Sequence, residues 1–390
     1  MRVRIAVAGL GVIAQTVHLP LLERLRDRFE LTAVCDLSPS LTARTADRYG
    51  VPGRYTDVET MLAAGGFDAV ALLTSGSHGP AAASALRHGY FVLCEKPLAY
   101  TRAEAADLAA LDGGPVPKLM VGYMKQYDLA VARVLATNVA AGAQAIQVTV
   151  LHPSDGAQLA FARLPAPPLD VPAGTLAALR AADEDLLRAA VGDVPAAARR
   201  LYTTTLNSIS HDLSLLRLLA GGVATIDHVA LWPDHPGRPP TRSTAVATLA
   251  AGPATGGRSV ELAGTLGTGG RYTIHWHFLA DYPAYRETVA IHHATGSAEL
   301  VFPTPYLLGA PTRLTLVEGD GGAERRAEYA DVTPSFENEL LAFHAMVTEG
   351  VPPLTGVAGA TDDIVTAQLA VRHLAGTATG GEAAELPLPW

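Results

Sequence analysis

The fold is decided by the first segment of the chain, residues 2–14, RVRIAVAGLGVIA. Residues 2–8 are a short run rich in β-branched side chains that ends at Gly9, which predicts a buried strand closed by a glycine turn. From Val12 to Arg28, leucines recur at helical spacing. The segment therefore predicts a strand, a glycine turn and a helix in immediate succession.

The same alternation continues through the first third of the chain. Apolar runs predict further strands at residues 30–35, 69–74, 90–94 and 119–123, with helices at residues 40–49, 57–64, 80–88 and 101–111. Thr101 and Glu104 have the spacing of a capping box at the start of the last helix. Near-continuously apolar strands joined by helices imply a parallel sheet covered on both faces. We therefore expect an α/β, doubly wound domain over residues 1–123.

The glycine turn has the pattern G-x-G-x-x-A between the predicted strand and helix. In such a turn Gly9 makes the bend and Gly11 lets the backbone approach a pyrophosphate, while Val12 and Ile13 open the helix whose N-terminus faces it. Asp36 follows at the end of the second strand, where an acid accepts hydrogen bonds from the adenosine ribose hydroxyls. The pattern predicts a dinucleotide site.

The residues after Asp36 favour NAD over NADP. An NADP site would want a basic residue here, whereas Leu37 and Ser38 follow and would leave a 2′-phosphate facing a carboxylate. The alternative is that the glycines form a packing turn only and that Asp36 caps the next helix.

Length and composition restrict the class of protein. A chain of 390 residues, 49% hydrophobic and 17% charged, is long enough for two or three globular domains. Its net charge of -9 argues against nucleic acid or an anionic membrane as the main partner, because both attract clustered basic charge. We expect no membrane-spanning run and no signal peptide. Cys35 and Cys94 have neither metal nor disulfide spacing, which favours a reducing, cytoplasmic location.

The chain changes character after Tyr123. Helices are expected at residues 127–136, 174–190, 335–348 and 362–374, and strands at residues 145–151, 244–249, 259–262, 271–278, 286–292, 298–302 and 312–317. We expect a second, α+β domain over residues 124–390 with a large, mostly antiparallel open sheet. Within it, residues 153–200 are compatible with either a lid over the substrate or an oligomer contact.

A second group of polar residues, Glu95, Lys96 and Pro97, directly follows a predicted buried strand. Ligands bind beyond the carboxyl ends of strands in an open parallel sheet, so Glu95 and Lys96 are expected at the cofactor crevice. The chain has 29 basic residues, but its only lysines are Lys96, Lys118 and Lys125. The alternative is that Glu95 and Lys96 form an ordinary salt bridge. Their position after the strand, together with the scarcity of lysine, favours a functional site.

Three motifs together resemble the glucose-fructose oxidoreductase / inositol dehydrogenase family, known as Gfo/Idh/MocA. They are the G-x-G-x-x-A turn, the segment TSGSH at residues 74–78, and the segment GYFVLCEKPL at residues 89–98. The resemblance covers residues 1–127 and implies that the first domain is a Rossmann domain. It also implies an oxidoreductase that uses NAD, NADP being the less favoured cofactor.

The resemblance further implies which residues lie beside the cofactor in the second and third motifs. They are Thr74, His78, Glu95, Lys96 and Pro97. In that family the lysine is catalytic or positions the cofactor. The open sheet of the second domain commonly mediates oligomerisation, so a homodimer or homotetramer is expected.

The resemblance also implies an aspartate and a histidine four residues apart on a helix of the second domain. This chain has Asn207 and His211 at that spacing, within NSISHDLSLLR at residues 207–217. The two residues share a helix face, with asparagine in place of the carboxylate. Asp212 is expected to point elsewhere. A helix cap for Asn207 and a core or surface role for His211 are the alternatives.

Oxidation of an alcohol needs a base near the carbinol, and Lys96 and His211 are the candidates. Burial and the positive nicotinamide ring should lower the pKa of Lys96 from its ordinary value. Asn207 is expected to give a neutral hydrogen bond to the substrate or to the imidazole, so His211 should stay neutral. The resemblance implies a sugar, inositol or related polyol as substrate. An NAD-binding regulator without redox turnover and an NAD-assisted glycoside-cleaving enzyme are the rival functions.

Further candidates come from two short segments. Tyr123 and Lys125 lie at the expected domain junction, where the resemblance implies a residue that reaches the substrate, and inter-domain structure is the alternative. His275 and His277 share one face of a predicted strand, but no third ligand accompanies them at a diagnostic spacing. We therefore expect no metal site.

Overall fold

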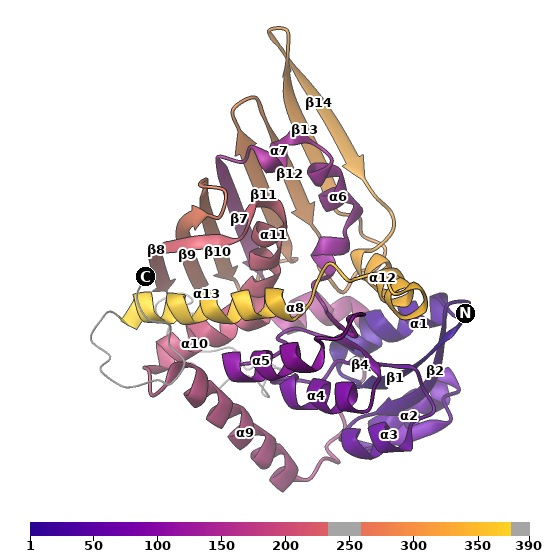
Figure 1. Cartoon of the computed structure of the whole chain (residues 1–390). Coiled ribbons are helices and arrows are strands. Elements are labelled where there is room, and N and C mark those ends of the chain that lie inside the picture. The colour runs from indigo at the N-terminus through magenta and orange to yellow at the C-terminus, as the bar shows by residue number, and fades with distance from the viewer. Residues whose placement is uncertain (233–258, 376–390) are drawn as a thin grey trace.

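In a computed structural model, which describes residues 1–232 and 259–375, the chain folds around two sheets (Figure 1). One is a parallel six-stranded sheet from the first third of the chain, and the other is a mostly antiparallel eight-stranded sheet. The predicted fold class is thereby confirmed. The predicted boundary at Tyr123 falls between the last strand of the first sheet and the first strand of the second. The expected strand at residues 244–249 lies outside the described residues.

The first sheet has the strand order β3-β2-β1-β4-β5-β6, and all neighbouring pairs are parallel. Its strands are β1 (Val3–Ala8), β2 (Phe29–Cys35), β3 (Gly53–Tyr55), β4 (Ala69–Leu72), β5 (Phe91–Cys94) and β6 (Leu119–Val121). The chain switches direction across the sheet between β1 and β4, and a crevice at such a point is where doubly wound sheets bind ligands. β3 was not predicted.

Helices join these strands, and alternate residues of β1 enter two different clusters of buried side chains. The helices are α1 (Leu19–Arg24), α2 (Pro39–Tyr49), α3 (Val58–Ala64), α4 (Gly79–Arg87) and α5 (Arg102–Leu111). The helix expected from residue 12 to residue 28 is present from residue 12 to residue 24, with a π-helical turn at Ala14–His18 that leads into the short α1. Pro20 lies in the first turn of α1 and has no N–H with which to continue a regular α-helix through this point.

The second sheet has the order β14-β13-β12-β11-β7-β10-β9-β8, in which only β7 and β10 pair in parallel. Its strands are β7 (Ala145–His152), β8 (Val223–Trp232), β9 (Ser259–Leu266), β10 (Arg271–Phe278), β11 (Arg286–His293), β12 (Gly296–Phe302), β13 (Arg313–Asp320) and β14 (Ala323–Ala330). Buried residues alternate with half-exposed ones along β10, so one face of the sheet is covered more than the other.

The helices of the second part include several that cross one face of this sheet (Figure 1). They are α6 (Leu129–Leu135), α7 (Asn138–Ala141), α8 (Asp155–Leu159), α9 (Ala173–Val191), α10 (Ala196–Thr204), α11 (Ser210–Ala220), α12 (Ser335–Glu349) and α13 (Val357–Ala375). A π-helical turn at Thr205–Ile209 connects α10 to α11. Asn207 therefore lies before α11, and the predicted single helix from residue 207 begins as this π turn.

Helix α12 belongs to the hydrophobic core of the first sheet, although it follows the second sheet in sequence. Its residues Phe336, Leu340, Phe343 and Met346 are buried in one cluster with alternate residues of β1. The first 123 residues therefore do not bury their own core completely. The C-terminal part of the chain returns to cover one face of the parallel sheet.

We expect Thr101→Ala to lower the free energy of unfolding by about 1 kcal/mol, because the predicted capping box of α5 is confirmed. Thr101 Oγ1 accepts from the Glu104 N–H at 3.0 Å, and Glu104 Oε2 accepts from the Thr101 N–H at 3.0 Å. Urea unfolding measures the change, and Thr101→Ser, which keeps the acceptor oxygen, is the control. Equal midpoints for the alanine and serine variants would contradict the expectation.

Candidate functional site

The glycine turn after β1 has the two properties expected of a dinucleotide turn. Gly9 has φ +90°, and a Cβ there would lie 2.5 Å from the carbonyl carbon of Leu73, so only glycine fits. A Cβ at Gly11 would meet no atom within 4 Å. The backbone of Gly11 is thus open to a ligand, with Val12 and Ile13 at the start of the π-helical segment behind it. The turn fits a bound pyrophosphate.

Asp36 lies at the carboxyl end of β2, beside this turn. Its Oδ2 accepts from the Leu10 N–H at 2.9 Å and its Oδ1 accepts from the Ser38 N–H at 2.9 Å. The carboxylate therefore ties the glycine turn to the start of α2. The capping oxygen of α2 belongs to Ser38, whose Oγ accepts from the Leu41 N–H, and not to Asp36.

The loop after β4, which contains Thr74 and His78, is fastened to the loop after β5. His78 is buried, and its ring nitrogens lie 2.7 Å from the Pro97 carbonyl oxygen and 2.9 Å from the Thr74 carbonyl oxygen. Burial lowers the pKa of the His78 imidazole. The Lys96–Pro97 peptide bond is cis. His78 thus contacts the backbone of both predicted cofactor loops.

Glu95 and Lys96 point to different surroundings at the end of β5. Glu95 is buried and its Oε1 lies 3.2 Å from Nε2 of His18, a residue of the π-helical turn after the glycines. Lys96 is half-buried, and its Nζ donates to the backbone carbonyl of Asn207 at 2.7 Å. The adjacent acid and base therefore do not form a salt bridge with each other.

The charge of Lys96 is disfavoured where it lies. Burial lowers the pKa of its ammonium group, Lys125 adds to the decrease, and Glu95 opposes it. This is the direction expected from the sequence.

Asn207 and His211 have separate surroundings. The Asn207 side-chain amide donates to the Thr203 carbonyl at 2.8 Å, so it is directed back along the preceding turn. His211 is half-buried and its Nδ1 has no hydrogen-bond partner. Burial, together with the charges of Lys96 and Lys125, holds the pKa of the imidazole well below its ordinary value. The neutral imidazole is therefore favoured, which is the expected direction, but the cause is burial and the two lysines and not a hydrogen bond from Asn207.

Lys125 forms a buried cluster of charged and polar groups with residues from distant parts of the chain. Its Nζ donates to Glu287 of β11 and lies 3.4 Å from Oδ1 of Asp212 in α11. The Tyr285 hydroxyl donates to Glu287 Oε2 at 2.6 Å. Burial opposes the charge of Lys125, but Glu287 and Asp212 outweigh it and raise the pKa of the ammonium group. Burial and Glu287 hold the pKa of Asp212 well above its ordinary value.

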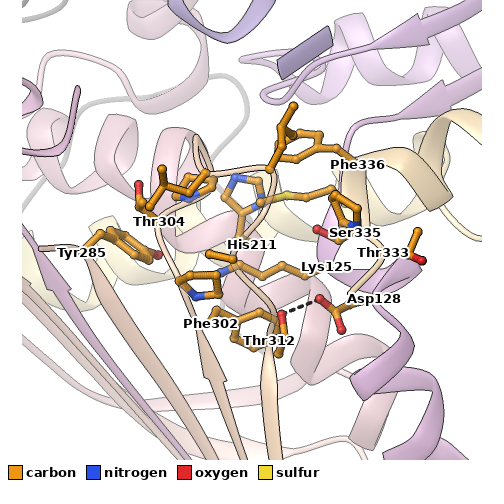
Figure 2. A pocket seen from close by; sticks show the side chains of 17 residues that line it. Lys125, Asp128, His211, Tyr285, Phe302, Thr304, Thr312, Thr333, Ser335 and Phe336 are labelled. Atoms are coloured by element: carbon orange, nitrogen blue, oxygen red, sulfur yellow. Dashed lines mark hydrogen bonds between the residues drawn. The ribbon is translucent and has the colours of Figure 1, made fainter. Parts of the chain in front are cut away.

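A pocket adjoins this cluster at the junction of the two sheets (Figure 2). Lys125, His211 and Tyr285 contribute to its wall. The rest comes largely from residues that follow β12 and from the start of α12, namely Phe302, Pro303, Thr304, Pro305, Leu307, Leu308, Ala310, Thr312, Thr333, Pro334, Ser335 and Phe336. Asp128 and Met124 complete the lining. An imidazole, an ammonium group, a phenol and a carboxylate thus line one cavity with mixed polar and apolar walls, which is an arrangement that suits a small polar ligand.

Tyr123 is placed in the packing between α11 and α13, away from this pocket. It is buried, its hydroxyl donates to Asp363 Oδ2 at 2.5 Å, and the Arg217 guanidinium lies over its ring. Arg217 also bonds Asp363 at 2.9 Å. Tyr123 therefore has the contacts of the inter-domain alternative.

Two further predictions concern residues outside the pocket. Within residues 1–232 and 259–375 no group of three or more His, Cys, Asp or Glu side chains could hold a metal ion. His275 and His277 stack at 6.1 Å, and His275 lies 3.9 Å from Glu261. No helix in these two ranges is long and apolar enough to cross a membrane.

Sequence reasoning missed Glu287, Tyr285 and Asp212. Asp212 was expected to point elsewhere than His211, and it does not line the pocket; the expectation did not include its buried contact with Lys125. A usable signal existed for Glu287, because it lies two residues before Val289 on the face of β11 that becomes buried. A carboxylate on a buried strand face requires a partner.

The doubly wound sheet, the open Gly11 and the acid at the end of β2 define a dinucleotide-binding domain. The family model of the Gfo/Idh/MocA oxidoreductases, described as an oxidoreductase family with an NAD-binding Rossmann fold, matches residues 3–123. The match is confined to the N-terminal domain, and for that domain it confirms the resemblance predicted from the sequence.

A curated relative matches about a third of the chain. The chain is 27% identical over 131 residues to an inositol 2-dehydrogenase from Salmonella paratyphi B. The match covers 33% of this chain and 39% of that protein, so it spans about two fifths of the relative's length.

Solved structures resemble the whole chain in fold. The myo-inositol dehydrogenase from Lactobacillus casei, in complex with NAD(H) and myo-inositol, has a TM-score of 0.65 and 17% identity, covering 96% of this chain and 95% of that one. A 3-ketoreductase from Actinomadura kijaniata, in complex with TDP-benzene and NADP, has a TM-score of 0.62 and 16% identity, covering 95% and 96%. At these identities the likeness concerns the fold.

We expect Lys125→Met to lower the free energy of unfolding by about 3–5 kcal/mol, because it leaves the buried carboxylate of Glu287 without its cation. Denaturant unfolding measures the change. Lys118→Met is the matched control, since Lys118 is only half-buried and its ammonium group pairs with no carboxylate: it donates to the Gly89 carbonyl and lies over the Phe91 ring. Adding Glu287→Gln to Lys125→Met should recover part of the loss. A Lys125 variant no less stable than the Lys118 variant would refute this account of the cluster.

Proposed function

We propose that the protein is an NAD-dependent oxidoreductase that transfers a hydride between nicotinamide and a secondary alcohol or ketone of a sugar, inositol or related polyol. One observation carries this proposal. Lys96 Nζ, just after β5, bonds the backbone carbonyl of Asn207, so the predicted cofactor crevice contacts the π-helical turn that leads into α11 and His211. The match of residues 3–123 to an NAD-binding oxidoreductase family supports it.

In the oxidation that we propose, Lys96 is the base. NAD, when bound, supplies the electrophilic carbon that accepts hydride. The neutral amine of Lys96 takes the hydroxyl proton of the substrate, and the carbinol becomes a ketone. The lowered pKa of Lys96 makes the neutral amine more available than in an ordinary lysine. His211, neutral in the adjoining pocket, donates or accepts a hydrogen bond at the substrate oxygens.

Asn207 takes a positioning part in this scheme, since its backbone carbonyl holds the Lys96 ammonium group. The side-chain amide of Asn207 has its own partner in Thr203. We also propose that Gly9, Gly11, Val12, Ile13, Asp36, Thr74, His78, Glu95 and Pro97 form the cofactor site, and that Lys125 acts on the substrate through the pocket wall. A cytoplasmic homo-oligomer assembled through the less covered face of the eight-stranded sheet completes the proposal, and the buried, unpaired Cys35 and Cys94 agree with a reducing compartment.

The test is turnover with a panel of sugars, inositols and aminocyclitols in the presence of NAD, followed by NADH absorbance. We expect NADH to form, and we expect Lys96→Ala to lower kcat by about a hundredfold or more. Lys118→Ala, at a lysine remote from the crevice, should keep full activity. Failure to form NADH, together with failure of NADH to reduce the corresponding ketones, would favour an NAD-binding regulator. Release of a glycoside fragment without net NADH would favour the NAD-assisted cleavage.

The pH dependence follows from the same assignment. In the oxidation direction kcat/KM should rise with pH, because only the neutral amine of Lys96 accepts a proton, and the midpoint should lie below the ordinary pKa of lysine. His211 adds no second limb above neutral pH, since its imidazole is already neutral there. Lys96→Arg should lose the rising limb because a guanidinium stays charged. A wild-type profile that is flat between pH 6 and pH 10 would remove Lys96 as the base.

A further inference from the structure

Residues 153–200, which join β7 to the helices of the second sheet, reach back to the first sheet. Asp170 lies on this segment, ahead of α9, and accepts hydrogen bonds from the start of α2. Its Oδ1 accepts from Ser38 Oγ at 2.5 Å and its Oδ2 accepts from the Ser40 N–H at 2.9 Å. The segment therefore places a carboxylate on the two residues that open α2.

The donors that Asp170 uses are those that favour an anion. The first N–H groups of an α-helix have no partner within the helix and carry partial positive charge, and the Ser40 N–H is one of them. Neighbouring Asp36 accepts from the Ser38 N–H, so Ser38 contacts both carboxylates at once. Two negative groups from distant parts of the chain thus converge on Ser38.

The segment is held in place on both sides of Asp170. Prolines at positions 165, 167, 168 and 172 restrict the backbone around it, which lowers the entropy lost on ordering. In α9, Asp183 lies 3.4 Å from the Ser77 N–H of the loop after β4. The end of α9 is buried at Ala190, whose carbonyl accepts from Gln368 of α13. Asp170 itself is exposed, and its two hydrogen bonds hold it at the start of α2.

The carboxylate stays ionised. Hydrogen bonds from Ser38 and Ser40 lower the pKa of Asp170 to about 2. In residues 1–232 and 259–375, no Lys, Arg or His forms an ion pair with it, so its charge is not cancelled by a cation.

We propose that Asp170 is a cofactor-selectivity residue that excludes the 2′-phosphate of NADP by occupying its donors and repelling its charge. This rests on the proposed NAD-binding function. In the doubly wound fold the adenosine ribose lies against the acid that ends the second strand, here Asp36. A phosphate on the 2′-oxygen would compete for Ser38 Oγ–H and the Ser40 N–H, and it would bring nearly two negative charges to two carboxylates. The unphosphorylated ribose of NAD carries no such charge and is tolerated.

The test compares the binding of NADH and NADPH to the full-length protein by fluorescence titration at fixed ionic strength. In Asp170→Asn, the ratio of the NADPH dissociation constant to the NADH dissociation constant should fall by about tenfold from its wild-type value, because one repulsive charge is removed without a change in size. NADH affinity should change by less than about threefold.

Asp185→Asn is the matched control, since Asp185 is an exposed acid of the same segment that pairs with Arg188. It makes the same change in net charge and should leave the ratio unaltered. Thermal unfolding of each variant checks that the fold is intact.

Three outcomes overturn the proposal. The first is a ratio in Asp170→Asn equal to the wild-type value. The second is tighter binding of both cofactors by the same factor, which would mean that Asp170 blocks the adenosine site itself. The third is an equal shift of the ratio in Asp185→Asn, which would assign the effect to overall charge. If the wild-type protein binds neither cofactor, the proposed function fails, and the inference fails with it. If it binds NADH and only the ratio is insensitive to Asp170, the inference alone fails.

Discussion

The positive charge of Lys125 has to be neutralised inside the protein, and the junction of the two sheets is arranged around that requirement. An unpaired buried ammonium group would cost several kcal/mol, so Lys125 must contact carboxylates. These come from Glu287 on β11 and Asp212 on α11. The contact with Asp212 holds the first turn of α11 against Lys125, and His211, adjacent to Asp212, lies in the wall of the pocket.

The two lysines of the junction have opposite surroundings, and this decides what each can do chemically. Lys125 faces carboxylates that raise its pKa, so it is a permanent cation. Lys96 bonds only a backbone carbonyl through its Nζ, and burial lowers its pKa. Both charges act on His211 and keep its imidazole neutral. In a chain whose other basic residues are nearly all arginine, Lys96 is positioned as the group that can both hold and release a proton, which a guanidinium does not do.

Local signals in the sequence were sufficient for most of the first sheet and insufficient where distant segments meet. The glycine turn at Gly9 and the cap at Thr101 depend on neighbouring residues, and both were predicted. The edge strand β3 has only three residues, too few to show an alternating pattern of apolar and polar side chains. The other edge strand, β14, is largely exposed, and its sequence AERRAEYA is rich in charged residues and shows no apolar alternation either. The packing of α12 on β1 joins residues over three hundred positions apart, and no local pattern encodes it.

At the predicted cofactor crevice, too, the sequence indicates the residues of a local motif but not those that a distant segment contributes. Asp36 could be recognised because it follows the glycine turn at a set spacing and ends a strand, so the motif alone predicted a ribose acid. Asp170 has no spacing to any motif, and it reaches Ser38 only because the chain between β7 and α10 folds back over the first sheet. A selectivity inferred from the residues directly after Asp36 is therefore incomplete. In the NAD site that we propose, the second part of the chain contributes a second carboxylate, which contacts the same serine as Asp36.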